Sequence, residues 1–163
     1  MLATPGPLGY YAGVESGLPS GPTVIMHTFP VPFARYATWM LEGATLCVPE
    51  VQHLSSKTIS PGIKQRSRLH WWLAIQQTRQ KGHPILLNEY GHLTETPAAN
   101  FLIAQDKKLL SPRKTDILNG VSLWFVENLC EELGLMLQEE DMTLARCQEA
   151  DEALICGTAF GLA

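Results

Sequence analysis

The sequence predicts a mixed α/β fold of the α+β type, in which helices flank a sheet that is largely antiparallel or mixed. Three observations favour this fold. Short apolar and β-branched segments alternate with turn residues, longer segments show the helical spacing of apolar residues, and the two kinds do not follow a regular βαβ order. Hydrophobic residues make up 45% of the 163 residues, which is enough for a sizeable core.

The first half of the chain is expected to contain two strands and two helices. Residues 1–22 are rich in glycine and proline and are predicted to be loop. Proline follows both predicted strands, and Gly43 and Gly82 stand where helices commonly end. The expected elements are a strand over 23–29, a helix over 33–42, a strand over 44–48, a loop over 50–62 and a helix over 65–81.

The second half is expected to contain a hairpin, further strands and two helices. Asn119 is predicted to cap a helix that ends at Leu133, and Thr143 to cap a short one over 143–149. The longer helix has one apolar stripe, formed by Val121, Trp124, Phe125, Leu129 and Leu133. The remaining elements are a hairpin of 84–88 and 92–95 with its turn at 89–91, and strands over 100–104, 109–110, 135–138 and 152–156.

The composition disfavours several classes of protein. A net charge of −4 and a pI near 5.7 argue against nucleic acid as the main partner. The longest apolar segments are too short to span a bilayer and no secretory signal is evident, so we expect a cytoplasmic protein without a membrane partner. The cysteines form no C-x-x-C pair and are expected to be reduced core thiols. The histidines are scattered without ligand spacing, so no metal site is expected.

The loop before the second predicted helix carries the first candidate site residue, Lys64. A lysine between a loop and a helix can point into a cleft while the helix holds its neighbours, as a Schiff-base lysine requires. The nearby charges of Arg66 and Arg68 would favour its neutral, nucleophilic form. Two other interpretations stay open here: a solvated surface lysine, and a basic anion-binding patch formed with Lys57, Arg66 and Arg68.

Glu95 stands at the end of a predicted strand, just before the proline of a turn. A carboxylate in that position can face a pocket. Near the ring nitrogen of a pyridine cofactor it would keep that nitrogen protonated, so that the ring accepts electrons. The alternative is a surface glutamate in a turn. Asn100 is expected to organise the backbone of this turn rather than to contact a ligand.

Two further segments have the features of an anion site. Residues 117–122 open the long helix with free backbone N–H groups, a glycine and a serine hydroxyl, which suits a phosphate. The last predicted strand ends in Gly157 and Thr158, which offer another N–H group and another hydroxyl. Helix capping by Asn119 and a simple strand-end turn are the structural alternatives.

Together and in this order, the four segments resemble those of the class IV aminotransferases, which include branched-chain and D-amino-acid aminotransferases and aminodeoxychorismate lyase. The resemblance covers about residues 20–163 and is strongest over 63–69, 91–102, 117–122 and 150–159. It implies the large domain of fold type IV, a barrel-like, mostly antiparallel sheet flanked by helices. It also implies pyridoxal 5′-phosphate as the cofactor. The Lys-x-x-x-Arg-Leu spacing after Lys64 is similar to that of the lyase-like members.

The resemblance further implies a role for each candidate residue. Lys64 would bind the cofactor covalently and move the proton between substrate and cofactor, and Glu95 would pair with the pyridine nitrogen. The phosphate would be held by Gly120, Val121, Ser122 and Thr158. The substrates would be an amino acid and a 2-oxoacid, and the full-length protein would be a homodimer.

The chain departs from the family pattern in several places. Leu123 stands where the family usually has an arginine. The family's small N-terminal domain, which supplies an arginine for the phosphate and several substrate contacts, is expected to precede residue 1, and its last strands and helix to follow residue 163. We therefore expect residues 1–22 to be a loop or interdomain region and residues 23–163 to be a C-terminally truncated, cofactor-binding large domain.

The leading hypothesis is thus a pyridoxal-phosphate-dependent aminotransferase, of which this chain is the cofactor-binding domain and alone inactive. One alternative is aminodeoxychorismate lyase, which uses the same lysine and forms 4-aminobenzoate and pyruvate. The other alternative is a non-catalytic relic or interaction domain of the same fold, because fold alone does not establish function. The missing arginine at Leu123 and the missing small domain favour that last interpretation.

Overall fold

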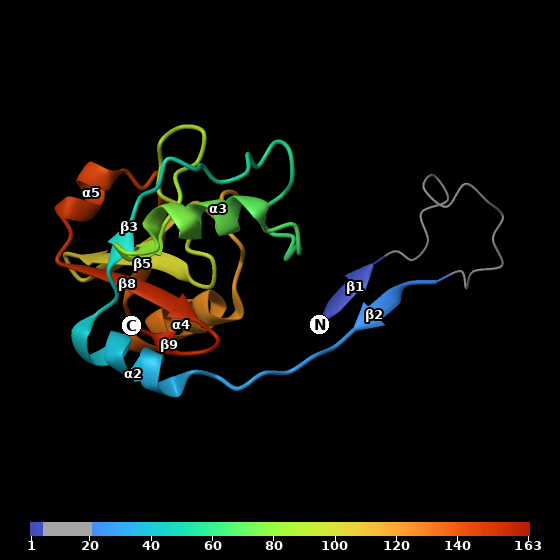
Figure 1. Ribbon diagram of the computed structural model, residues 1–163. Helices are drawn as coiled ribbons and strands as arrows, with labels where there is room; N and C mark the ends of the chain where they lie inside the picture. Colours follow the sequence, from blue (N-terminus) through green and yellow to red (C-terminus); the bar gives the residue numbers. More distant parts are fainter. Residues whose placement is uncertain (5–20) are drawn as a thin grey trace. The chain divides into compact units, whose positions relative to one another are not determined.

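The computed structural model describes residues 1–4 and 21–163 and divides the chain into two compact units, Met1–Val31 and Pro32–Ala163 (Figure 1). In the first unit, β1 (Leu2–Thr4) pairs antiparallel with β2 (Thr23–Ile25).

The strand β1 corrects the prediction of loop over residues 1–22. Leu-Ala-Thr contains neither glycine nor proline and pairs with the β-branched residues of β2. The same prediction for residues 5–20 lies outside the described part of the chain. β2 is also shorter than predicted, because its register with β1 ends at Ile25.

The second unit is built on a five-stranded sheet in the order β7-β6-β5-β8-β9, of which Figure 1 labels β5, β8 and β9. Of its strand pairs, β6–β7 is parallel and the others are antiparallel, so the prediction of a mixed α/β fold with a mostly antiparallel sheet is confirmed. The short β9 was not predicted and forms where the chain turns back after β8. The strands are β5 (Asn100–Gln105), β6 (Lys108–Pro112), β7 (Met136–Glu140), β8 (Glu152–Gly157) and β9 (Gly161–Leu162).

Alternate side chains of β5 serve two apolar cores on opposite faces of this sheet. Phe101 and Ile103 are buried on one face, together with residues of the hairpin before β5. Leu102 is buried on the other face, where α4 (Val121–Leu133) packs with Leu123, Val126 and Cys130. This packing brings the N-terminus of α4 close to the start of β5 and the end of β8.

Two helices have nearly the predicted ends. α2 (Phe33–Glu42) ends at Gly43, whose φ of 80° suits a glycine. α5 (Leu144–Gln148) begins after Thr143, whose Oγ1 accepts a hydrogen bond of 3.1 Å from the backbone N–H of Arg146. Within residues 1–4 and 21–163, no helix combines the length and the hydrophobicity that crossing a membrane requires.

The helix α3 (Leu69–Thr78) begins four residues later than the predicted start at residue 65. Residues 65–68 are Gln-Arg-Ser-Arg and have no apolar side chain to bury, and Arg68 donates from Nη2 to the carbonyl oxygen of Pro97. α3 packs through Trp71 and Ala74 on Leu86, which follows the short strand β4 (His83–Pro84). β4 in turn pairs parallel with β3 (Leu46–Cys47).

The helix α4 also corrects two predictions. Its N-cap is Gly120 and no side chain caps it, so Asn119 does not have the predicted role. The apolar stripe predicted from the sequence is mostly solvent-exposed, with Trp124 and Phe125 each 62% exposed, while the neighbouring residues such as Leu123 are buried. Both sets of residues have helical spacing, so periodicity alone could not decide which set faces the sheet.

The predicted hairpin before β5 is confirmed, although its two arms are joined by one isolated β-bridge and not by a continuous strand pair. Leu87 and Leu93 form an antiparallel bridge, and Asn88 closes the turn because its Oδ1 accepts hydrogen bonds from the backbone N–H groups of Tyr90 and His92. After the hairpin the chain turns once more, and an antiparallel bridge joins Glu95 to Asn100 at the start of β5.

A substitution in β5 tests the packing of the sheet. Leu102→Ala should lower the free energy of unfolding by about 2–5 kcal/mol, because Leu102 is fully buried and its removal leaves a cavity under α4. The matched control is Leu41→Ala on α2, where leucine is 86% exposed and the loss should be below about 0.5 kcal/mol. Urea unfolding monitored by circular dichroism measures both, and equal losses would contradict this packing.

Candidate functional site

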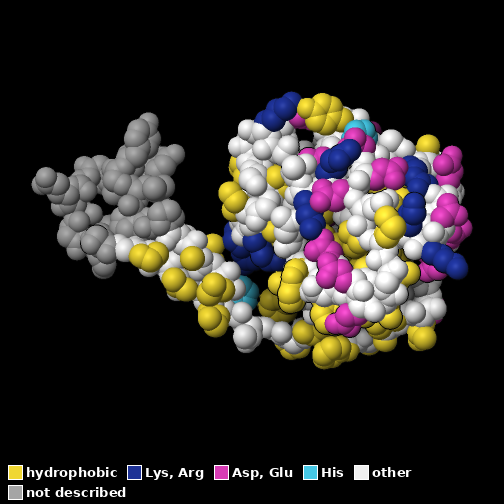
Figure 2. All heavy atoms as spheres, turned by 180° about the vertical axis from the view of Figure 1, so that it is seen from behind, with side chains coloured by type: hydrophobic (Ala, Val, Ile, Leu, Met, Phe, Trp, Pro, Cys, Tyr) yellow, Lys and Arg dark blue, Asp and Glu magenta, His cyan; other side chains and the backbone are white. Residues whose placement is uncertain are grey.

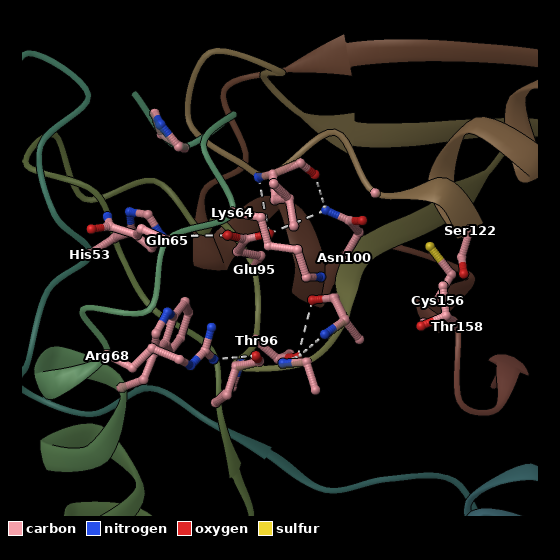
Figure 3. A pocket seen from close by; sticks show the side chains of 18 of the residues that line it. His53, Lys64, Gln65, Arg68, Glu95, Thr96, Asn100, Ser122, Cys156 and Thr158 are labelled. Carbon is pink, nitrogen blue, oxygen red and sulfur yellow. Dashed lines mark hydrogen bonds and ion pairs between the residues drawn. The ribbon is translucent and has the colours of Figure 1, made fainter. Parts of the chain in front are cut away.

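A pocket of about 140 Å³ lies between the loop before α3, the turn before β5, the end of β8 and the N-terminus of α4 (Figure 3). All six candidate residues from the sequence line it. These residues are Lys64, Glu95, Gly120, Val121, Ser122 and Thr158. They come from four segments that are far apart in the chain, so the fold brings together what the sequence only suggested separately.

Lys64 lies in the loop before α3, in a tight turn in which the backbone N–H of Gln65 bonds the carbonyl oxygen of Ile63 at 2.8 Å. Its side chain points into the pocket, although the residue as a whole is exposed (Figure 3). The helix starts only at Leu69, so Lys64 does not stand at a loop-to-helix junction as expected. The hydrogen bond from Arg68 to Pro97 instead joins the lysine loop to the turn before β5.

Glu95 is a partly buried carboxylate, with 13% of its side chain exposed. Its Oε2 accepts hydrogen bonds from the backbone N–H of Leu118 at 3.1 Å and from Nδ2 of Asn100 at 3.3 Å. Its Oε1 lies 3.6 Å from Nε2 of His53 (Figure 3). Since burying an unpaired carboxylate is costly, these contacts are what allow an acid at this depth.

Asn100 joins the acid to the segment that leads into α4. Besides Glu95, its Nδ2 donates to the carbonyl oxygen of Leu118 at 2.8 Å. Its Oδ1 lies so close to Gly120 that a Cβ at that position would clash with it. The φ of Gly120 is −70°, so this glycine is required for space and not for an unusual backbone conformation.

The N-terminus of α4 forms the opposite side of the pocket. The first N–H groups of a helix have no partner within the helix, and here no side chain caps them. Together with the macrodipole of the helix, they favour an anion. The hydroxyl groups of Ser122 and Thr158 lie on the same side of the pocket (Figure 3). This combination fits a phosphate group.

Several further ionisable groups surround the pocket. Burial lowers the pKa of Arg68, an effect that the nearby charge of Glu95 opposes. Burial also raises the pKa of the Cys156 thiol to about 11, so this pocket-lining thiol is neutral. Figure 2 shows acidic and basic side chains intermingled on the face that it displays.

Two further residues that line the pocket are His53 and His70. Neither was a candidate site residue from the sequence, because the histidines lack the spacing of metal ligands. Their ring centroids are 5.6 Å apart. No local pattern connects His53 with Glu95, which lies in a different segment, so the sequence held no signal for this pair. In the part of the chain that the structure describes, no group of three or more His, Cys, Asp or Glu residues could bind a metal ion.

Comparison with known proteins identifies relatives of most of the chain. Residues 2–163 match the family described as amino-transferase class IV. The chain is 30% identical, over 157 residues, to aminodeoxychorismate lyase from Vibrio harveyi, an alignment that covers 93% of this chain and 55% of the lyase.

The fold is similar to solved aminotransferase structures. Branched-chain aminotransferase from Thermoproteus uzoniensis, solved with norvaline, superimposes with a TM-score of 0.70 at 25% identity, covering 75% of this chain and 42% of that enzyme. The branched-chain amino acid aminotransferase from Thermobaculum terrenum in its PLP form gives a TM-score of 0.68 at 22% identity, over 74% of this chain and 41% of that enzyme. The chain therefore spans about half the length of the lyase and less of these aminotransferases.

The close approach of Gly120 to Asn100 can be tested by substitution. Gly120→Ala should lower the free energy of unfolding by about 1–3 kcal/mol, because the new methyl group must displace the Asn100 side chain. Gly62→Ala is the control, since its nearest neighbour would be a serine hydroxyl at an ordinary 3.5 Å. In a double-mutant cycle with Asn100→Ala, the two losses should be less than additive. Fully additive losses by urea unfolding would contradict the contact.

Proposed function

Since this chain belongs to the class IV aminotransferase family, we propose that it is the cofactor-binding part of an enzyme that uses pyridoxal 5′-phosphate to transfer an amino group from an amino acid to a 2-oxoacid. The observation that carries the proposal is the meeting of a lysine, a partly buried acid and an open helix N-terminus in one pocket. The family is pyridoxal-phosphate-dependent, and the donor set of the pocket suits the amine, ring-nitrogen and phosphate contacts of that cofactor.

The cofactor would supply an aldehyde, which condenses with an amine with loss of water, and a ring that accepts an electron pair. Lys64 would provide the amine and later move a proton to and from the substrate carbon. Its flexible side chain, reaching into the pocket from a loop, supports both tasks.

Glu95 would accept a hydrogen bond from the N–H of the pyridine ring and so keep that nitrogen protonated. The contacts from Leu118 and Asn100 hold the carboxylate in position for this task. Gly120, Val121, Ser122 and Thr158 would bind the phosphate through N–H groups and hydroxyls at the other side of the pocket. Homodimeric assembly stays a prediction from the resemblance, and a cytoplasmic location stays a prediction from the composition.

Leu123 bears on the alternative of a non-catalytic relic. The family's usual arginine is absent at this position, but Leu123 is 1% exposed and packs with Leu102 and Val126 between α4 and the sheet. It is not among the residues that line the pocket. The substitution therefore leaves the proposed cofactor contacts intact, which favours the enzyme.

Covalent capture tests the role of Lys64. After cofactor is added to the full-length protein, absorbance near the edge of the visible range should appear, and borohydride reduction should fix the cofactor on Lys64, as found by mass spectrometry of peptides. Lys64→Ala should abolish both signals. Lys57→Ala is the matched control and should retain them, because Lys57 pairs at the surface with Glu89 at 3.0 Å. A wild type that gives no adduct on Lys64 would refute the proposal.

Aminodeoxychorismate lyase is the second candidate function, favoured by the 30% identity to the Vibrio harveyi lyase over nearly the whole chain. Both activities would use the same lysine, so the pocket residues do not separate them. The full-length protein should be assayed with amino acid and 2-oxoacid pairs and with aminodeoxychorismate. Transfer of the amino group to a 2-oxoacid supports the aminotransferase. Release of pyruvate from aminodeoxychorismate without a 2-oxoacid acceptor would instead show that the protein is a lyase.

A further inference from the structure

The side chain of Arg68 connects the two segments of the pocket that carry Lys64 and Glu95. Its Nη2 donates a hydrogen bond to the backbone carbonyl oxygen of Pro97 (Figure 3). Arg68 stands four residues after Lys64, at the end of the lysine loop over residues 61–68, and Pro97 stands two residues after Glu95. This contact therefore joins the segment of the amine to the segment of the acid.

The hydrogen bonds inside the lysine loop are local. The backbone N–H of Ile63 donates to the carbonyl oxygen of Ser60 at 3.1 Å, and that of Gln65 donates to the carbonyl oxygen of Ile63 at 2.8 Å. Both bonds join residues two or three positions apart, so they shape the turn around Lys64 without fixing its distance from the acid. The hydrogen bond from Arg68 supplies that longer-range constraint.

The acceptor of this hydrogen bond lies in a turn that has contacts of its own. Oγ1 of Thr96 accepts from the backbone N–H of Ala99 at 2.9 Å, and the backbone N–H of Thr96 donates to the carbonyl oxygen of Ala99 at 2.9 Å. The end of β8 packs closely on the same turn, because a Cβ at Gly157 would come within 3.0 Å of the carbonyl oxygen of Ala98. These contacts fix the turn, and with it the carbonyl group of Pro97.

The guanidinium group is also held from the side of α3. Cζ of Arg68 lies over the ring of Trp71, 5.8 Å from its centroid, where the face of an aromatic ring attracts a cation. Trp71 is 5% exposed and packs with Ala74 and Leu86. Arg68 as a whole is exposed, so these two contacts restrict its side chain more than burial does.

The charges around the pocket favour the same placement of Arg68. Burial lowers the pKa of Arg68, the charge of Glu95 opposes this effect, and the charge of Arg66 adds to it. Glu95 thus attracts the guanidinium group and Arg66 repels it. Glu95 lines the pocket and Arg66 does not, so both charges favour Arg68 on the pocket side of the loop.

We propose that Arg68 is a positioning residue for Lys64, which fastens the lysine loop to the turn next to Glu95 and so keeps the amine within reach of the cofactor. A lysine side chain is long and flexible, so its nitrogen reacts efficiently only if the backbone that carries it is held in place. The importance of Arg68 for the reaction rests on the proposed function, whereas the fastening of the loop exists without cofactor.

Hydrogen exchange over milliseconds to seconds, read by mass spectrometry, tests the fastening in the cofactor-free, full-length protein. Arg68→Met keeps a long side chain but removes the donor, and it should speed exchange over residues 61–67 about fivefold. Residues 96–99 should change less than about twofold, because Thr96 holds their turn. Unchanged exchange over 61–67 would overturn the proposal.

Arg66→Met is the matched control for this measurement. Arg66 lies in the same exposed loop, two residues before Arg68, and it does not line the pocket. Its substitution removes one positive charge, as the substitution of Arg68 does, and should change the exchange of the loop less than about twofold. An equal effect of both substitutions would mean that the contact with Pro97 does not hold the loop.

The rate of covalent capture shows whether the fastening matters for Lys64. Pyridoxal 5′-phosphate should react with Lys64 of Arg68→Met about tenfold more slowly than with the wild type. Pyridoxine 5′-phosphate has an alcohol in place of the aldehyde, so it offers the same ring and phosphate but cannot bond to lysine. Its binding, measured by calorimetry, should change less than about twofold. Equal losses in capture and in binding would indicate general damage to the pocket and contradict a positioning role.

The pH dependence of capture separates the position of Lys64 from the charge of Arg68, which would also act on a nearby amine. Loss of position lowers the capture rate of Arg68→Met at every pH from about 6 to about 10, without a shift of the profile. A shifted profile, in which the variant reaches the wild-type rate at another pH, would show that charge and not position is responsible and would refute the proposal.

The failure of this inference and that of the proposed function are distinguishable. If the wild type captures no cofactor, the proposed function fails, and hydrogen exchange still decides whether Arg68 fastens the loop. If the wild type captures cofactor and Arg68→Met captures it equally fast, the function stands and the positioning role of Arg68 is wrong.

Discussion

The pocket depends on the partial burial of one carboxylate, that of Glu95. A carboxylate such as Glu95, with 13% of its side chain exposed, needs hydrogen-bond donors in place of the water that it loses. In this chain the donors are the backbone N–H of Leu118 and the amide of Asn100, and the ring of His53 lies 3.6 Å away on the other side. Satisfying this single group therefore requires the start of β5 and the segment before α4 to converge.

The hydrogen bonds of the same acid also position the N-terminus of α4, which forms the proposed phosphate side of the pocket. Asn100 binds both Glu95 and Leu118, and its side chain lies so close to Gly120 that this position has no space for a methyl group. The N-terminus of α4 is thereby held at a set separation from the acid. In the proposed function, the acid would bind one end of the cofactor and this helix end the other, so a displacement of Asn100 would affect both sides together.

The elements with local signals were predicted most accurately. Gly43 ends α2 and Thr143 caps α5 through contacts within a few residues, and both elements have nearly their expected bounds. The start of α3 and the buried face of α4 were not predicted correctly. The start of α3 depends on Pro97, which accepts a hydrogen bond from Arg68. The buried face of α4 depends on which of its two apolar stripes packs on the sheet. In both cases the contacting residues are distant in sequence.

The sequence by itself determined the family, the mixed α/β class and six candidate residues, because motifs such as the turn at Glu95 and the glycine before α4 are local patterns of residue types. Only the tertiary structure decided that these residues line one pocket and that Asn100 and Leu118 hold the acid by hydrogen bonds. The physical reason is that a buried charge takes its partners from whichever segments lie close in space, and sequence spacing does not record that proximity.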